Sequence, residues 1–111
     1  MKFALAAIFL ATAIGAAEAH SCDSDAREHA EVLLKFHFGD DTVLESQDVA
    51  VDETVRQLAP VKALKGNARF DVLEVWGHIY KSDYRMRFLY TQIPGDCLLM
   101  GQEIFEASDP Q

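Results

Sequence analysis

Paired cysteines of the kind that bind zinc or exchange thiols are missing from this chain. It has two cysteines, Cys22 and Cys97, and no Cys-x-x-Cys pair. Its four histidines form no His-Glu-x-x-His run, and no glycine-rich phosphate loop is present. These absences remove the strongest signatures of zinc, thiol-redox and phosphate-binding sites. No motif in the sequence is specific to one class of reaction.

Basic residues are also few. Ten lysines and arginines stand against eighteen aspartates and glutamates, which gives a net charge of −8. Because nucleic-acid partners require a positively charged footprint, we expect none. The same acidity disfavours docking on an anionic membrane. Lys81, Arg85 and Arg87 form one local basic spot, which we interpret as a charged rim.

The first 19 residues have the form of a cleaved secretory signal. Lys2 supplies the positive end, residues 3–17 form an apolar run, and Ala17-Glu18-Ala19 has the small-x-small form that signal peptidase reads. The run is too short for a typical membrane span, so no membrane insertion is expected after cleavage. We predict export, with a bacterial periplasm or the exterior as destination. Residues 20–111 then form a single small domain, whose net charge is still −8 because the signal holds one lysine and one glutamate.

Export to an oxidising compartment favours a disulfide between Cys22 and Cys97. The rival interpretation makes Cys22 a lipid-modified N-terminus. The preceding Ala19-His20-Ser21 lacks the usual large aliphatic residue three positions before the cysteine. Lipidation would also leave Cys97 unpaired. The sequence therefore favours the bridge over the lipid anchor.

Residues 69–106 predict a three-stranded antiparallel meander. They are rich in β-branched and aromatic residues, which suit a half-buried pleated surface. Turn signals divide them at Lys81-Ser82-Asp83-Tyr84 and at Ile93-Pro94-Gly95-Asp96. If the first turn is centred on the middle two residues of its signal, Gly77 lies opposite Phe88.

Side-chain alternation gives this meander two faces. The apolar face, expected to form the core, carries Leu73, Val75, Ile79, Tyr84, Met86, Phe88 and Tyr90. The opposite face is aromatic, basic and partly wet, and carries Glu74, Trp76, His78, Tyr80, Arg85, Arg87 and Leu89. Tyr80 is expected to lie over Arg85 as a cross-strand pair.

That second face is either a solvated sheet surface or a binding surface. Trp, Tyr and Arg are enriched at interaction hot spots. An antiparallel sheet can leave one face to water, so such residues can be exposed. The candidate binding residues are Trp76, His78, Tyr80, Arg85, Arg87 and Leu89.

Residues 25–38 predict an amphipathic helix that packs on the core face. Asp25 and Glu28 have the spacing of a capping box, and Gly39 is the expected stop. The apolar stripe consists of Ala26, Ala30, Leu33, Leu34 and His37, widened by Val32 and Phe36.

A further strand is expected at Thr54–Leu64, joined to the meander by a hairpin. The expected register of this hairpin places Leu58 opposite Val75. Pro60 indicates a bulge or an edge position, because it has no N–H to donate. A short helix over residues 53–59 is the alternative. Before it, either residues 42–44 or residues 49–51 form a short strand.

In the last hairpin we expect Tyr90 opposite Leu99. Continued without interruption, this register would put Glu103 on the core side opposite Met86, so a bulge is expected near Gly101. Glu74 and Glu103 are expected on opposite faces, so they would not act as a carboxylate pair in acid/base chemistry.

The predicted fold is α+β, with one N-terminal helix on a three- to four-stranded antiparallel meander. This outline is similar to cystatin-like folds. The Gln-x-Val-x-Gly loop typical of cystatin inhibitors is absent, since the nearest text, Gln57-Leu58-Ala59-Pro60-Val61, does not match it. The resemblance therefore implies architecture only, without protease inhibition.

His20 supports a separate metal hypothesis. Cleavage after Ala19 would offer both its α-amine and a ring nitrogen to one ion, which resembles the copper brace of certain secreted copper proteins. Cleavage after Ala17 would place His20 third, an arrangement that suits square-planar Cu(II) or Ni(II). The alternative is that His20 merely marks the cleavage point.

The preferred hypothesis is a small exported, non-catalytic binding module that needs no cofactor. Its partner, a protein or a small ligand, would dock on the mixed face, with Trp76 as anchor. Arg85 and Arg87 would pair with carboxylates or carbonyls. Copper binding through His20, and a small secreted enzyme or hydrolase inhibitor, are the alternatives.

Overall fold

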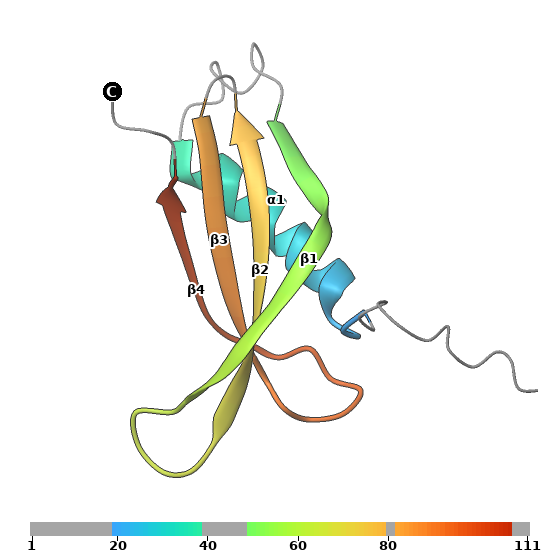
Figure 1. Cartoon of the computed structure of the whole chain (residues 1–111), viewed down its shortest axis with the longest axis vertical. Helices are drawn as coiled ribbons and strands as arrows, with labels where there is room; N and C mark the ends of the chain where they lie inside the picture. Colours follow the sequence, from blue (N-terminus) through green and yellow to red (C-terminus); the bar gives the residue numbers. More distant parts are fainter. Residues whose placement is uncertain (1–18, 39–48, 80–81, 108–111) are drawn as a thin grey trace, which may run out of the picture.

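One helix covers one face of a four-stranded antiparallel sheet in the computed structural model, which describes residues 19–38, 49–79 and 82–107 (Figure 1). The elements are α1 (Asp23–Phe38), β1 (Val49–Lys62), β2 (Arg69–Ile79), β3 (Ser82–Thr91) and β4 (Leu99–Glu106). The strands lie side by side in chain order. The predicted α+β class is confirmed. Within the described ranges, no helix has the length and apolarity needed to cross a membrane.

Helix α1 begins at Asp23, two residues before the predicted start. A turn leads into it, in which the Asp23 backbone N–H donates to the His20 carbonyl at 3.0 Å and the Asp23 carboxylate accepts the His20 backbone N–H at 3.1 Å. The predicted capping box is wrong, because Asp25 lies inside the helix. Its carboxylate instead accepts the hydroxyl of the buried Tyr90 at 2.8 Å.

The apolar stripe of α1 is narrower than predicted. Ala26, Ala30 and Leu34 are fully buried against the sheet. Val32 and Phe36, expected to widen the stripe, are 66% and 80% exposed. Each lies two positions after a buried residue, which is about 200° around a helix, so both point away from the sheet.

The predicted core face is confirmed. Its residues are at most 4% exposed, and they are Leu73, Val75, Ile79, Tyr84, Met86, Phe88 and Tyr90. Helix α1 crosses this face diagonally, chiefly over β1 and β2, so helix and sheet bury each other's apolar sides.

Gly77 on β2 permits the close approach of the helix. A Cβ at this position would lie 2.8 Å from Leu34 Cδ2 and 2.9 Å from Met86 Cε. We expect Gly77→Ala to lower the free energy of unfolding by about 1–3 kcal/mol, because both side chains must shift in a packed core. Urea denaturation measures the loss.

Gly101→Ala is the matched control for this prediction. A Cβ at Gly101 would meet only Leu89, at 3.8 Å, which is ordinary contact. If the two alanine variants are equally stable, the close packing of α1 over Gly77 is contradicted.

The predicted disulfide is confirmed. Cys22 and Cys97 are bonded, with their Cα atoms 5.7 Å apart and 75 positions apart in the sequence. The bridge ties the start of α1 to the loop before β4. It occupies the sulfur that lipidation of Cys22 would require, so the two modifications exclude each other.

The registers of the first two hairpins differ from the predictions. Gly77 pairs with Tyr84 rather than with Phe88. The partner changes by four positions, an even number, so every side chain of β2 and β3 keeps its predicted face. Val75 pairs with Val55 rather than with Leu58.

Strand β1 is longer and less regular than predicted. It begins at Val49, as one of the alternatives for a preceding strand suggested, and it includes the residues of the alternative short helix, which is therefore wrong. Its pairing with β2 shifts register twice, between Val51 and Val55 and between Leu58 and Val61. The bulge and edge position expected from Pro60 are both confirmed.

The last hairpin contains the expected bulge. Tyr90 pairs with Leu99, after which the register shifts and Gly101 pairs with Leu89. This shift moves Glu103 out of the core and opposite Arg87. Since Arg87 also pairs with Glu74, the prediction that the two glutamates lie on opposite faces is wrong. The predicted helix stop at Gly39, the possible strand at residues 42–44 and Tyr80 lie outside the described residues.

Candidate functional site

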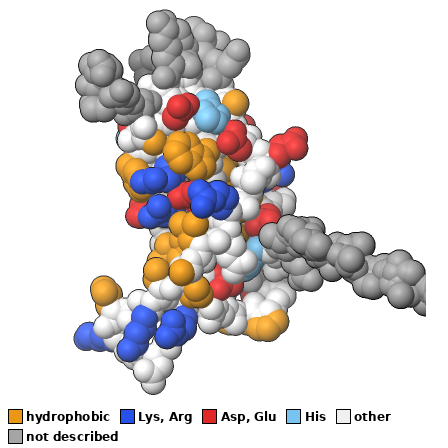
Figure 2. Space-filling view, in the orientation of Figure 1, with side chains coloured by type: hydrophobic (Ala, Val, Ile, Leu, Met, Phe, Trp, Pro, Cys, Tyr) orange, Lys and Arg blue, Asp and Glu red, His pale blue; other side chains and the backbone are white. Residues whose placement is uncertain are grey.

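The sheet face opposite α1, called the outer face below, holds the predicted binding residues (Figure 2). Five of the six are described and all are half-buried, namely Trp76, His78, Arg85, Arg87 and Leu89. Trp76 and His78 come from β2, and the other three come from β3. Strand alternation thus brings the described candidates together on one surface.

A buried carboxylate lies at the centre of this face. Glu74 is only 2% exposed although it is on the side of the sheet without a helix. Arg87 Nε donates to one of its oxygens at 3.0 Å, and Arg56 Nη1 and Trp76 Nε1 donate to the other at 3.4 and 3.3 Å. Arg85 Nε lies 3.8 Å from the first oxygen. These donors compensate the cost of burying the charge.

The sheet register positions this cluster. Glu74 lies on an inner strand, directly between Arg56 on β1 and Arg87 on β3. Long arginine side chains from both neighbouring strands therefore cover the shorter glutamate. The sequence prediction placed Glu74 on this face but missed its burial, and it missed Arg56 entirely. The sequence signal for this cluster is an arginine on each strand next to Glu74. It can be recognised only if the strand register is known.

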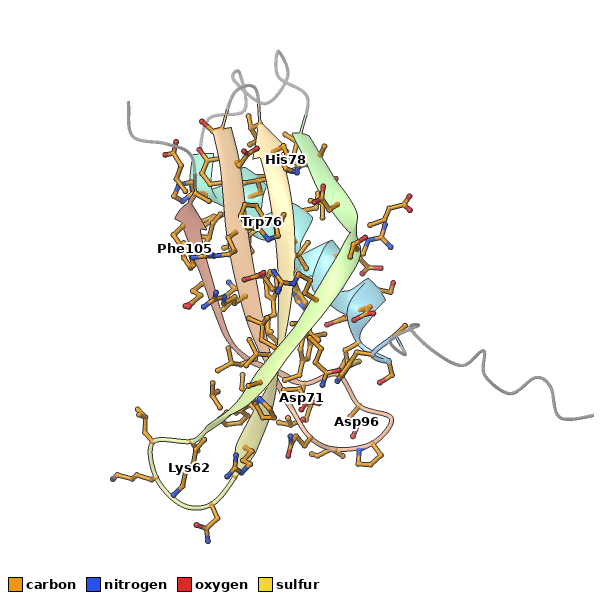
Figure 3. The ribbon with its side chains drawn as sticks, viewed as in Figure 1. Lys62, Asp71, Trp76, His78, Asp96 and Phe105 are labelled. Atoms are coloured by element: carbon orange, nitrogen blue, oxygen red, sulfur yellow. A yellow bond between two sulfur atoms is a disulfide. The ribbon has the colours of Figure 1, made fainter. Side chains whose placement is uncertain are left out.

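Two aromatic rings flank the arginines. The Arg85 guanidinium lies 4.3 Å from the ring centre of Phe105 and 5.9 Å from that of Trp76. Arg87 lies 5.6 Å from Phe105. Figure 3 shows these rings on β4 and β2, the strands on either side of β3. In the sheet register Arg85 pairs with Trp76, and its predicted partner Tyr80 lies outside the described residues.

The arginines have more donors than the protein uses. Three arginines share one buried glutamate, and Arg85 Nε is buried without a hydrogen-bond partner. In the described part of the chain, no hydrogen bond engages the Nη groups of Arg85 or Arg87, whose side chains are 34% and 33% exposed. On a chain of net charge −8, this spot can accept an anionic or carbonyl group from outside.

An apolar groove of about 380 Å³ adjoins Arg87. Its lining consists of Val61, Val72, Leu89 and Gly101, with Arg87, Gln102 and Glu103 as the polar members. Figure 2 shows apolar side chains directly below the blue and red cluster. The outer face therefore combines unused charged donors with an apolar hollow.

His78 on β2 is hydrogen-bonded to both neighbouring strands, an arrangement called the His78 clip below. Its Nδ1 lies 2.7 Å from Asp83 on β3, and its Nε2 lies 2.9 Å from Asp52 on β1. The pKa of His78 is raised above its usual value, chiefly by the hydrogen bond to Asp83 and further by Asp52, against the opposing effect of burial. Both ring nitrogens are engaged within the protein, which indicates a structural role.

This clip predicts a pH-dependent stability. The folded-state pKa of His78 lies above 6.5, so its stabilisation is complete below that pH and is lost as the pH rises through the raised pKa. The ring is 38% exposed, so salt should reduce the effect. We expect the stability advantage of the wild type over His78→Gln to shrink between about pH 6 and 8 in urea denaturation. An NMR titration that gives a pKa at or below 6.5 would contradict the clip.

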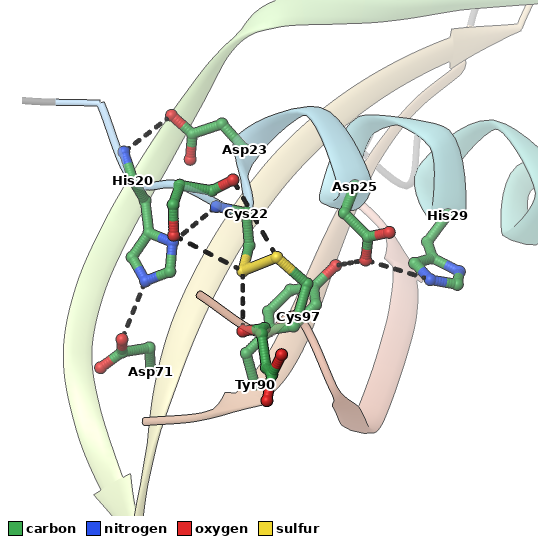
Figure 4. Close-up of a disulfide and its surroundings, with 10 residues drawn as sticks. His20, Cys22, Asp23, Asp25, His29, Asp71, Tyr90 and Cys97 are labelled. Carbon is green, nitrogen blue, oxygen red and sulfur yellow. Dashed lines mark hydrogen bonds and ion pairs between the residues drawn. A yellow bond between two sulfur atoms is a disulfide. The ribbon is translucent and has the colours of Figure 1, made fainter. Parts of the chain in front are cut away.

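His20 is held beside the disulfide (Figure 4). Its Nδ1 accepts the Cys22 backbone N–H at 2.9 Å, and its Nε2 lies 2.8 Å from Asp71 Oδ2. The pKa of Asp71 is lowered chiefly by its hydrogen bond with His20 and to a smaller extent by the hydrogen bond from Gln92. A copper ion at His20 would have to displace these bonds. Among the described residues, no three His, Cys, Asp or Glu side chains are grouped to hold a metal.

Comparison of the chain with known proteins gave no match among protein-family models, curated proteins or solved structures. No neighbour confirms the cystatin-like outline, and the outer face must be interpreted from its own geometry.

Proposed function

We propose that the protein is a small exported binding module without catalytic activity, and that its partner docks on the outer face. The observation that carries the proposal is the excess of arginine over glutamate in the buried cluster. Arg85 and Arg87 keep unused donors on a surface where half-buried aromatic rings are also available. A carboxylate or carbonyl of the partner would complete these donors.

Trp76 and Phe105 would supply the apolar part of the contact. Aromatic residues and arginine carry most of the energy in many interfaces, usually in a central position surrounded by weaker contacts. Trp76 and Phe105 lie beside the arginine side chains, so they would form such a centre. Arg85 makes no hydrogen bond to Glu74, so its Nη donors remain available to a partner.

Export is supported by two features. The first 19 residues have the pattern of a secretory signal, and the domain contains one disulfide. Disulfides persist in oxidising compartments, whereas reducing systems remove them in the cytosol. The copper alternative has no comparable support, because the ring and backbone nitrogens of His20 already make hydrogen bonds.

The test uses Arg85→Ala in the disulfide-bonded protein. We expect this variant to bind the partner about 30-fold more weakly, as is typical of hot-spot arginines. Its stability should change by less than about 1 kcal/mol, because the lost ion pair is partly exposed. The partner is isolated from an extract of exported proteins by capture on the wild type, and its affinity is measured by calorimetry.

Lys35→Ala provides the control. Lys35 is exposed on α1, across the sheet from the outer face, and among the described residues its ion pair is with Glu31. We expect it to bind as the wild type does. A partner that binds Arg85→Ala as tightly as wild type would refute docking on the outer face.

A further inference from the structure

We infer, on the basis of the proposed function, that the groove beside Arg87 receives the carboxyl-terminal residue of a polypeptide. An apolar side chain would fill the hollow, and the free carboxylate would bind the arginine. The ligand chemistry follows from the two ends of the groove, one apolar and one that carries the Arg87 guanidinium, with Gln102 and Glu103 beside it.

The apolar end of the groove has a buried base. Val72 is 4% exposed, and Leu89 and Val61 rise beside it while remaining partly accessible. Side chains from β1, β2 and β3 therefore line the hollow, which stays open to water. Binding of an aliphatic side chain there would be favourable, because its apolar surface and that of Val61 and Leu89 would be removed from water.

Gly101 makes the hollow possible. It follows the bulge in β4 and pairs with Leu89, and its missing side chain would project beside Leu89 on the outer face. A Cβ there would meet Leu89 at 3.8–3.9 Å and would otherwise stand in the groove. Any larger residue at this position would occupy the space that the ligand needs.

The cationic end is pre-organised. Glu74 accepts the Nε–H of Arg87 at 3.0 Å, which fixes the guanidinium while leaving its Nη groups without a partner in the described residues. A guanidinium held in this way presents its remaining donors to a carboxylate at little entropic cost. The carboxylate of the ligand would form charge-assisted hydrogen bonds at this point.

The open shape of the groove favours a polypeptide over a free fatty acid. A fatty acid gains most from an enclosed cavity that covers its whole chain, and this hollow leaves one side wet. A polypeptide fills it with one side chain while the rest of the chain continues into water. Gln102 and Glu103 line the groove and offer hydrogen bonds to peptide groups there.

An NMR titration of the disulfide-bonded protein tests the inference. The probes are the N-acetylated tripeptide Ala-Ala-Leu with a free carboxylate, the same tripeptide with a terminal amide, and octanoate. We expect the acid to shift the backbone signals of Val72, Leu89 and Gly101. The amide should bind at least about tenfold more weakly, because it lacks the charge.

Two variants locate the binding. Gly101→Val should fill the hollow and weaken the acid at least about tenfold, in line with the loss of one buried aliphatic side chain. Gly101→Ala, which adds one methyl group in ordinary contact, gives a second measurement should the valine variant fold poorly. Lys35→Ala should bind the acid as the wild type does.

The other outcomes overturn the inference. Equal affinity for acid and amide would remove the role of the carboxylate, and tighter binding of octanoate than of the peptide acid would replace the polypeptide by a fatty acid. No shift with any probe would reject the groove as a subsite. Partner binding by Arg85→Ala would still judge the proposed function separately, since Arg85 does not line the groove.

Discussion

Replacing Cys22 and Cys97 together by alanine should lower the free energy of unfolding by about 4 kcal/mol. The bridge spans 75 sequence positions, and a cross-link over a loop of that length removes much of the entropy of the unfolded chain. A domain of this size has only about 5–15 kcal/mol of stability, so the double variant should unfold at a much lower urea concentration.

The wild type treated with a thiol reductant is the matching control. Reduction opens the same loop without changing the sequence, so its unfolding midpoint should fall close to that of the double variant. If the double variant is as stable as the oxidised wild type, the bridge does not stabilise the fold.

Removal of Arg87 should produce the second large effect. In Arg87→Met the carboxylate of Glu74 stays buried and loses its shortest hydrogen bond. We expect a loss of about 2–3 kcal/mol, below the usual cost of breaking a buried pair because Arg56 and Trp76 still donate to Glu74. Urea denaturation at constant m-value measures this loss.

A double-mutant cycle isolates the pair. Glu74→Met combined with Arg87→Met removes both charges and replaces them with apolar groups, so the double variant should recover much of the loss. Arg85→Ala should cost less than about 1 kcal/mol, because Arg85 lies 3.8 Å from the carboxylate. Additive losses at Glu74 and Arg87 would show that the two side chains are not coupled.

Side-chain parity explains what the sequence predicted well. An alternating strand assigns each residue to a face whatever its exact partner, so the core residues from Leu73 to Tyr90 were identified despite a displaced turn. The pairing of Cys22 with Cys97 followed from the expected export of a chain that has two cysteines. The bulge near Gly101 was predicted because an uninterrupted register would place the Glu103 carboxylate in the apolar core.

The buried cluster could not be predicted because it depends on the partner across the strand rather than on the face. The expected turn would have put Glu74 opposite Thr91, whereas the observed register puts it opposite Arg87. Strand β1 posed the same difficulty, because the irregularity between Leu58 and Val61 lies between Arg56 and the hairpin, so a simple count back from the hairpin gives the wrong partner. The contact of Phe105 with both arginines likewise needed the register beyond the bulge.

The irregular outer strand β1 has a consequence for the protein in concentrated solution. Regular edge strands invite other molecules to extend the sheet, which is a common route to fibrils. On β1 the hydrogen-bonded ladder with β2 is interrupted twice, and Pro60 has no N–H to donate to an added strand. Polymerisation through this border is therefore hindered, and the molecule gains protection against aggregation from the same bulges that obscured its register.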